Sequence, residues 1–145
     1  MPDERMDVEA QVECLNRALR LQHRSVLQYS LVAGSVIGLE YQAHADKMRE
    51  HAESELEDAT RLVEKIAALG GNPTTEVAPI NFRGNPSEAL DRLIEDEGEA
   101  LEALQAAIEP TGREAASEAV EHRLEHMIMR KQEQVDYLLR AQRRP

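Results

Sequence analysis

The chain has 145 residues, of which 41% are hydrophobic and only 3% are aromatic, with no tryptophan. This length and apolar content are sufficient for one domain with an aliphatic core, and they exclude a chain that is disordered by composition. The 28 acidic and 17 basic residues give a formal net charge of −11, which excludes the basic face that nucleic-acid binding requires.

Apolar residues at helical spacing predict a first helix that follows the acidic residues 3–9 and runs to about Val32. The segment GSVIG at residues 34–38 predicts a short turn, so the next helix should run antiparallel to the first. This second helix is predicted over about 40–69, and the Gly-Gly pair at 70–71 is a typical helix stop.

Residues 71–86 contain three of the six prolines and have no helical period, and we expect the connection itself over 72–85. A connection of this length exceeds the roughly two to eight residues that usually join the helices of a bundle. We therefore expect an extended crossover that spans the length of the bundle. Val77, Ile80 and Phe82 are its predicted anchors on the bundle surface.

The third helix is predicted to begin with Asn85 as its N-cap and Pro86 at its first position, and to close at Pro110. Thr111 and Glu114 match a capping box for a fourth helix that ends in the basic tail RAQRRP. Four long helices joined by a short, a long and a short connection predict an all-α, up-down-down-up bundle. This is the ferritin-like connectivity, with one long crossover between the second and third helices.

The inward-facing side of each predicted helix is interrupted near its middle by polar residues. The period that buries their apolar neighbours also points these residues inward. Buried carboxylates destabilise a fold unless a cation or hydrogen bonds compensate them. The sequence therefore predicts a polar layer across the bundle, made of Gln22, Glu55, Asp58, Glu97, Lys131 and Gln134. The rest of the acidic run at 95–99 is expected to form a solvated face.

The chain resembles a bacterioferritin-type member of the ferritin-like superfamily. The resemblance rests on LNRALRLQHRSVLQY in the first helix, RLVEKIAALGG in the second and the shorter QVDYL in the fourth. It covers the chain after about residue 10 and implies one ferritin-like domain over residues 1–145. That superfamily builds a di-iron site from a Glu on each of two helices and a Glu-x-x-His motif on each of two others.

When the family's six ligand positions are mapped onto this chain as the resemblance implies, only two of them have the family's residue, Glu55 and Glu97. The first-helix Glu falls on Gln22, and the second-helix His falls on Asp58. The fourth-helix motif falls on Lys131-x-x-Gln134 and keeps neither ligand. The heme-ligating Met of bacterioferritins falls on Leu56, so heme is not expected.

The three carboxylates and Lys131 give the layer a formal charge of −2, which is enough for one divalent cation or two protons. Three interpretations of the layer remain open. In the first, Lys131 forms salt bridges with Glu55, Asp58 and Glu97 and replaces the metal pair. In the second, the three carboxylates hold one metal ion together with His51, which lies on the same stripe of the second helix. In the third, a shifted fourth helix completes a two-metal ferroxidase centre.

We therefore expect a ferritin-like bundle protein with a degenerate di-metal centre. It would contain a salt-bridged polar core or bind one divalent metal, iron or another, rather than two. Ferroxidase activity is expected to be weak or absent. The alternative is an active iron-handling ferroxidase or iron-storage protein with a remodelled di-iron site.

The sequence also carries expectations about partners and location. Cys14, Leu21, Ser25 and Val32 form a second apolar edge on the first helix, which predicts a homo-oligomer that is at least a two-fold dimer. A single cysteine excludes a disulfide framework within one chain. No apolar run approaches the roughly 18 residues of a membrane span, and no basic-plus-apolar leader is present. A soluble, cytoplasmic protein is expected.

Overall fold

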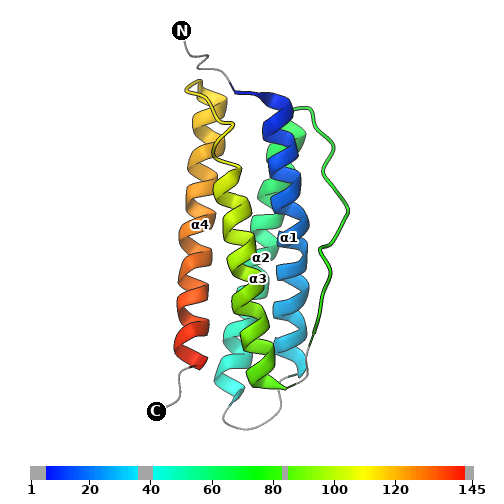
Figure 1. Cartoon of the computed structure of the whole chain (residues 1–145), viewed down its shortest axis with the longest axis vertical. Helices are drawn as coiled ribbons and strands as arrows, with labels where there is room; N and C mark the ends of the chain where they lie inside the picture. Colours follow the sequence, from blue (N-terminus) through cyan, green and yellow to red (C-terminus); the bar gives the residue numbers. More distant parts are fainter. Residues whose placement is uncertain (1–5, 36–40, 83–84, 143–145) are drawn as a thin grey trace.

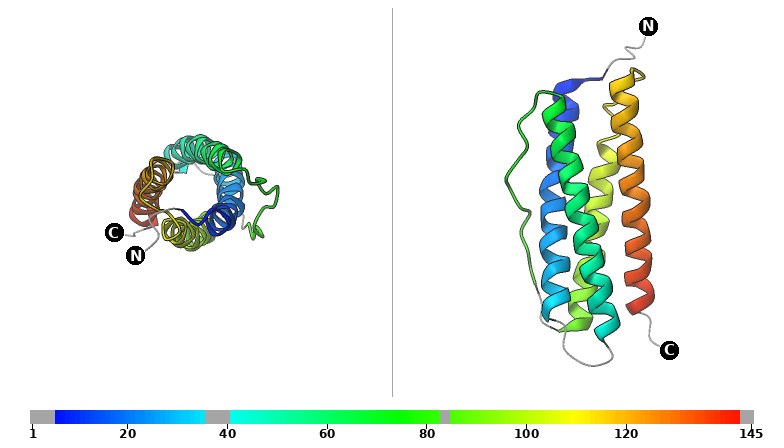
Figure 2. Two further views of the ribbon diagram at one scale, coloured as in Figure 1. Left: turned by 90° about the horizontal axis from the view of Figure 1, so that it is seen from above. Right: turned by 180° about the vertical axis from the view of Figure 1, so that it is seen from behind.

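The structure, a computed structural model, describes residues 6–35, 41–82 and 85–142. The helices lie side by side in an elongated bundle (Figure 1), and from above they surround a common axis (Figure 2). No strand occurs among the described residues. The predicted all-α bundle is therefore confirmed. Its four helices in the described ranges are α1 (Val8–Ser35), α2 (Gln42–Ala68), α3 (Pro86–Ala106) and α4 (Ala115–Gln142).

The order of the helices around the axis follows from their connections. α1 packs against α2 and α3, and α4 packs against α3 and α2. Among these neighbouring pairs, α1 and α2 make the most extensive contact and α2 and α4 the least. The crossover runs along the outside of α1 for the length of the bundle, so α2 and α3 point the same way (Figures 1 and 2). The predicted up-down-down-up topology is confirmed.

The ends of α2 and α3 follow the signals in the sequence. Gly70 has a φ of +82°, which an L side chain rarely adopts, and the N–H of Gly71 donates to the carbonyl oxygen of Ile66 at 2.9 Å. These features close α2 as a glycine C-cap does. The side chain of Asn85 accepts hydrogen bonds from two backbone N–H groups in the first turn of α3, where Pro86 is the first residue.

The predicted capping box of α4 is not formed. The Thr111 hydroxyl donates to the carbonyl oxygen of Ile108 at 2.7 Å, so it satisfies the end of the preceding turn instead. The Glu114 carboxylate accepts from the backbone N–H of Met6 at 3.0 Å. α4 then begins at Ala115. The Thr111 side chain thus stabilises the connection between α3 and α4. The Glu114 side chain binds the beginning of the described chain.

The crossover is anchored differently from the prediction. Val77 and Phe82 are 41% and 36% exposed, and Ile80 is half-buried. The anchor is Ala78, which is 1% exposed and donates its backbone N–H to the carbonyl oxygen of Arg20 at 3.1 Å. In an extended chain neighbouring side chains point to opposite sides, so burying Ala78 leaves Val77 outside.

Some predicted features lie outside the described residues. These are most of the turn at 34–38, the acidic residues 3–5 and the end of the basic tail, 143–145. Within the described part, no helix is both long enough and apolar enough to cross a bilayer.

Two apolar clusters fill the interior of the bundle, and each is built from several helices. They occupy different heights along the axis, because their members come from opposite halves of each helix. Aliphatic residues dominate both, as the low aromatic content predicts. The first cluster includes Leu15, Leu62, Leu104 and Leu124, and the second includes Tyr29, Met48, Leu93 and Leu138.

Candidate functional site

The polar layer lies between the two apolar clusters, and each of the four helices contributes to it. Along α1, for example, Gln22 follows Leu19 of the first cluster and precedes Tyr29 of the second. The layer therefore lies at one height along the bundle, between the two clusters. All six residues assigned to it from the sequence are buried: Gln22, Glu55, Asp58, Glu97, Lys131 and Gln134.

The centre of the layer is the ammonium group of Lys131, which is fully buried. Its Nζ atom lies 2.8 Å from Oε2 of Glu55 on α2 and 2.7 Å from Oε2 of Glu97 on α3. It also donates to the hydroxyl oxygen of Ser25 on α1, at 3.5 Å. A lysine ammonium has three N–H donors, and each finds an acceptor on a different helix.

The two carboxylates are further held from α1. The side-chain amide of Gln22 donates to the Glu55 carboxylate and, at 3.1 Å, to the Glu55 backbone carbonyl. The Ser25 hydroxyl donates to the Glu97 carboxylate. The sequence did not predict this role for Ser25, although its position one turn after Gln22 is a signal that could have found it.

Asp58 does not join the Lys131 cluster, so this part of the predicted network is wrong. Its carboxylate pairs instead with the guanidinium of Arg130, which is partly exposed. Three residues along a helix leave side chains about 60° apart around the axis, and this offset turns Asp58 from Glu55 toward the edge of α4. Burial raises the pKa of Asp58, and the charge of Arg130 opposes that rise.

His51 and Gln134 lie at one side of the layer, and within the described residues neither is hydrogen-bonded to Lys131. His51 packs edge-on against two tyrosine rings, with centroid distances of 5.3 Å to Tyr29 and 5.7 Å to Tyr137. Burial, reinforced by the charge of Lys47, lowers the pKa of His51 to about 4. The imidazole is therefore neutral at neutral pH.

Burial also governs the ionisation of the central cluster. It raises the pKa of Glu55 to about 7, against the attraction of Lys131, and the nearby charge of Glu97 adds to the rise. Burial by itself would lower the pKa of Lys131, but the carboxylates of Glu55 and Glu97 outweigh it and raise that pKa. Burial and the same two carboxylates raise the pKa of Tyr29. Lys131 thus stays charged, while Glu55 can take up a proton near neutrality.

The sequence profile of the ferritin-like domain family matches residues 12–143 of the chain. The chain belongs to the ferritin-like family. It is similar to a ferritin-like, diiron-carboxylate protein from Bacillus anthracis, with 26% identity and a TM-score of 0.86 over 94% of this chain and 98% of that one. A Rhodobacter capsulatus bacterioferritin shares the fold, with 23% identity and a TM-score of 0.81 over 95% and 86% of the chains. No curated protein matches significantly.

The residues of this ferritin-like bundle do not fit the pair of metal ions that the resemblance implies. Among the described residues, no group of three or more His, Cys, Asp or Glu side chains is placed to hold a metal ion. The Lys131 ammonium lies between Glu55 and Glu97, the two ligand positions that keep the family's residue. Two carboxylates and one ammonium leave a charge of −1, whereas two divalent ions carry +4.

A second buried polar cluster lies between α1, α3 and the crossover. Arg24 and Asp96 are 4% and 3% exposed, with 3.7 Å between Nη2 and Oδ1, and the partly exposed Arg92 lies 3.4 Å from Oδ2 of Asp96. Gln28 donates to Oδ2 of Asp96 at 2.6 Å, and Arg24 also reaches Glu99 at 3.4 Å and the carbonyl oxygen of Pro79 at 3.5 Å. The sequence predicted a solvated face here apart from Glu97, and for Asp96 that prediction is wrong, because Asp96 is buried with a cation.

The apolar edge assigned to the dimer from the sequence lies inside the bundle, so that assignment is wrong. Leu21, Ser25 and Val32 are at most 4% exposed, and Cys14 is half-buried against the first cluster. Because α1 has two neighbours within the chain, α2 and α3, both of its apolar edges are used internally.

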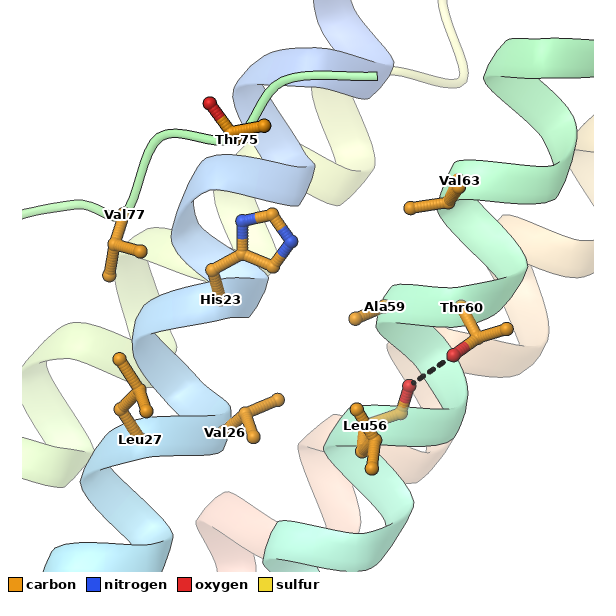
Figure 3. A pocket seen from close by; sticks show the side chains of 9 residues that line it. All are labelled: His23, Val26, Leu27, Leu56, Ala59, Thr60, Val63, Thr75 and Val77. Atoms are coloured by element: carbon orange, nitrogen blue, oxygen red, sulfur yellow. Dashed lines mark hydrogen bonds between the residues drawn. The ribbon is translucent and has the colours of Figure 1, made fainter.

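A different apolar surface is exposed on this ferritin-like bundle. A groove of about 420 Å³ runs between α1, α2 and the crossover (Figure 3). Leu27, Leu56 and Val77 on its walls are 44%, 58% and 41% exposed. Its lining includes one histidine, His23, and no acidic residue, lysine or arginine. The sequence missed this groove because the crossover forms one of its walls.

Proposed function

We propose that this protein is a ferritin-like bundle without ferroxidase activity, in which the ammonium group of Lys131 replaces the metal pair. The observation that carries the proposal is the position of Nζ, 2.8 Å from Glu55 and 2.7 Å from Glu97. A metal ion that used these carboxylates would have to displace a buried cation. Unit charges about 4 Å apart attract by roughly 4 kcal/mol even at an effective dielectric of about 20, so displacement is unfavourable.

The structural relatives define what this chain would lack. The Bacillus anthracis relative is a diiron-carboxylate protein, and the Rhodobacter capsulatus bacterioferritin has a dinuclear site and a heme iron. This chain departs from the family's ligands at Gln22, Asp58, Lys131 and Gln134. Its role would therefore be structural or binding, within one ferritin-like domain in the cytoplasm.

Binding of one divalent cation is the second candidate. It is favoured by the excess negative charge of the layer, which remains −1 with Lys131 paired and both central carboxylates ionised. Asp58 and His51 would have to turn toward Glu55 and Glu97 to complete such a site. In the structure Asp58 is held by Arg130. We therefore propose weak binding of one metal ion at most, rather than two.

Heme binding through the bacterioferritin position is not proposed, because Leu56 carries no atom that can ligate iron. Leu56 instead lies in the exposed apolar groove.

The apolar groove also suggests how the chain associates. A face without acidic side chains is the surface on which two copies of a chain with net charge −11 can meet without strong repulsion. We propose that the groove is covered by a second copy in a two-fold dimer.

Metal content and iron oxidation test this function directly. The 145-residue protein, purified without added metal, should contain well under one iron per chain by elemental analysis. After anaerobic addition of Fe(II) and exposure to oxygen, oxidation should be no faster than in protein-free buffer. Two irons bound per chain with rapid oxidation would overturn the proposal. One tightly bound iron per chain would favour the single-metal candidate.

A further inference from the structure

A polar cavity opens between α2 and α4, the two neighbouring helices that pack least closely. Its volume is about 360 Å³, within the range of small-molecule sites, which begins at about 300 Å³. His51 from α2 and Gln134 and Tyr137 from α4 line it. It lies beside the polar layer but outside the Lys131 cluster, and the metal-free function proposed above does not use it.

Two buried side chains on the cavity wall have polar atoms without a hydrogen-bond partner in the described chain. They are Oε1 of Gln134 and Nε2 of His51, and the side chains are 4% and 6% exposed. An amide oxygen can only accept a hydrogen bond, and an imidazole nitrogen accepts one when the other ring nitrogen carries the proton. Both atoms can therefore be satisfied by an N–H or O–H donor.

The charges around the cavity also favour a donor that is positively charged. The two cations on its wall are already paired: Lys47 lies 3.3 Å from Glu50, and Arg130 pairs with Asp58. Glu133 on the same wall has no such partner within the described residues. When Asp58 is counted as the partner of Arg130, the charges around the cavity sum to −1, and the whole chain has a net charge of −11.

The chain already holds two of its own ammonium groups, one with side-chain oxygens and one against an aromatic ring. The Lys131 ammonium is held by side-chain oxygens, and the Lys47 ammonium lies 5.7 Å from the centroid of the Tyr137 ring, a cation–π contact. A metal ion fits less well, because no three His, Cys, Asp or Glu side chains converge in the described part of the chain.

We propose that the cavity between α2 and α4 binds a small organic ammonium ion of the aliphatic amine or diamine class. Its N–H groups would donate to Gln134 and His51 once these buried side chains turn toward the cavity, and its charge would face Glu133. This site requires no metal, so its success or failure is independent of the metal content and iron oxidation that test the proposed function.

The test uses the ¹⁵N-labelled 145-residue protein and 1,4-diaminobutane as the probe, with NMR chemical-shift changes as the readout. Saturable changes should appear on α2 and α4 around the cavity, including the side-chain amide of Gln134. The neutral isostere 1,4-butanediol and the anion succinate should bind at least tenfold more weakly. No saturable change with the diamine, or equal binding of the butanediol, would overturn the proposal.

Three variants separate this site from general attraction to an acidic surface. Glu133→Gln and Gln134→Leu should each weaken diamine binding at least fivefold. Glu125→Gln is the matched control, because it removes the same charge from an exposed position on the same helix. It should change binding less than twofold. If Glu125→Gln weakens binding as much as Glu133→Gln does, the diamine is only a counter-ion and the proposal fails.

Discussion

Lys131 on α4 and Glu55 on α2 form a fully buried ion pair, with 2.8 Å between Nζ and Oε2. These two helices pack less closely than the other neighbouring pairs, so the ion pair joins them where apolar packing contributes least. A buried pair of this kind adds little net stability over an apolar pair, but removing one partner leaves an uncompensated charge. Substitution of Lys131 should therefore cost far more than the pair itself contributes.

Lys131→Met should lower the free energy of unfolding by about 3–5 kcal/mol near pH 8, because Glu55 and Glu97 lose their counter-ion. The loss should be smaller near pH 5. The pKa of Glu55 in the folded protein is about 7, above its ordinary value of 4.5, so between these values the folded state retains a proton that the unfolded state has released. Without Lys131 that pKa rises further, and the penalty grows with pH. Urea unfolding followed by circular dichroism at the two pH values measures the difference.

The control for this prediction is Lys65→Met, which removes a half-buried lysine from the last turn of α2. Only its interaction with the helix dipole should be lost, a change of less than about 1 kcal/mol. An equal effect of the two substitutions, or a Lys131→Met effect that does not depend on pH, would contradict the role assigned to the central ion pair.

Restoring the family's ligands should restore metal binding. The triple variant Gln22→Glu, Lys131→Glu and Gln134→His removes the ammonium and adds two carboxylates and an imidazole to the layer. Mn(II) at about 100 times its dissociation constant should then stabilise the fold by about 2.7 kcal/mol. The double variant that keeps Lys131 should gain little. Thermal unfolding with and without Mn(II) distinguishes the two, and an equal gain in both would show that Lys131 does not block the site.

Arg24→Met should destabilise the protein by less than the roughly 3–5 kcal/mol of a buried pair broken completely, because Asp96 would lose its buried cation and keep only the partly exposed Arg92, 3.4 Å away. The substitution also removes the hydrogen bond to Pro79, so limited proteolysis should cut the crossover faster. Arg20→Met is the control, since Arg20 is 39% exposed and lies 3.5 Å from the exposed Glu76. Its effect should be below about 1 kcal/mol. Similar losses in both variants would refute a special role for the buried arginine.

Leu56→Glu should abolish self-association without changing the helix content, because it places a carboxylate in the apolar groove proposed as the dimer surface. Light scattering and circular dichroism measure the two effects. Met129→Glu is the control, an equally exposed position on α4 at 56%, and it should leave the dimer intact. A parent protein that is already monomeric at micromolar concentration would end the dimer proposal.

Leu21→Arg should unfold the protein rather than dissociate a dimer. Leu21 is 4% exposed and belongs to the first apolar cluster, so the charged side chain would be buried in the core. Circular dichroism should therefore show a loss of helical signal. An intact helix content would show that α1 is not packed as the structure describes.

The sequence by itself determined the four helices, the long crossover and the existence of a polar layer. The reason is that burial follows the helical period: Gln22, Glu55, Glu97 and Lys131 share that period with apolar neighbours and must face inward in any bundle of these helices. The ends marked by Gly70 and Asn85 were equally predictable, because their signals are local hydrogen bonds and backbone angles.

Only the tertiary structure decided how the inward groups pair. Whether Asp58 meets Lys131 or Arg130 depends on the relative height and rotation of α2 and α4, which no spacing along one helix defines. The same holds for Asp96, which faces Arg24 of another helix as well as Arg92 of its own. It also holds for Leu21, because α1 packs against a second helix of the same chain. Local periodicity determines which face of a helix is buried, but the neighbours on that face come from segments far apart in the chain.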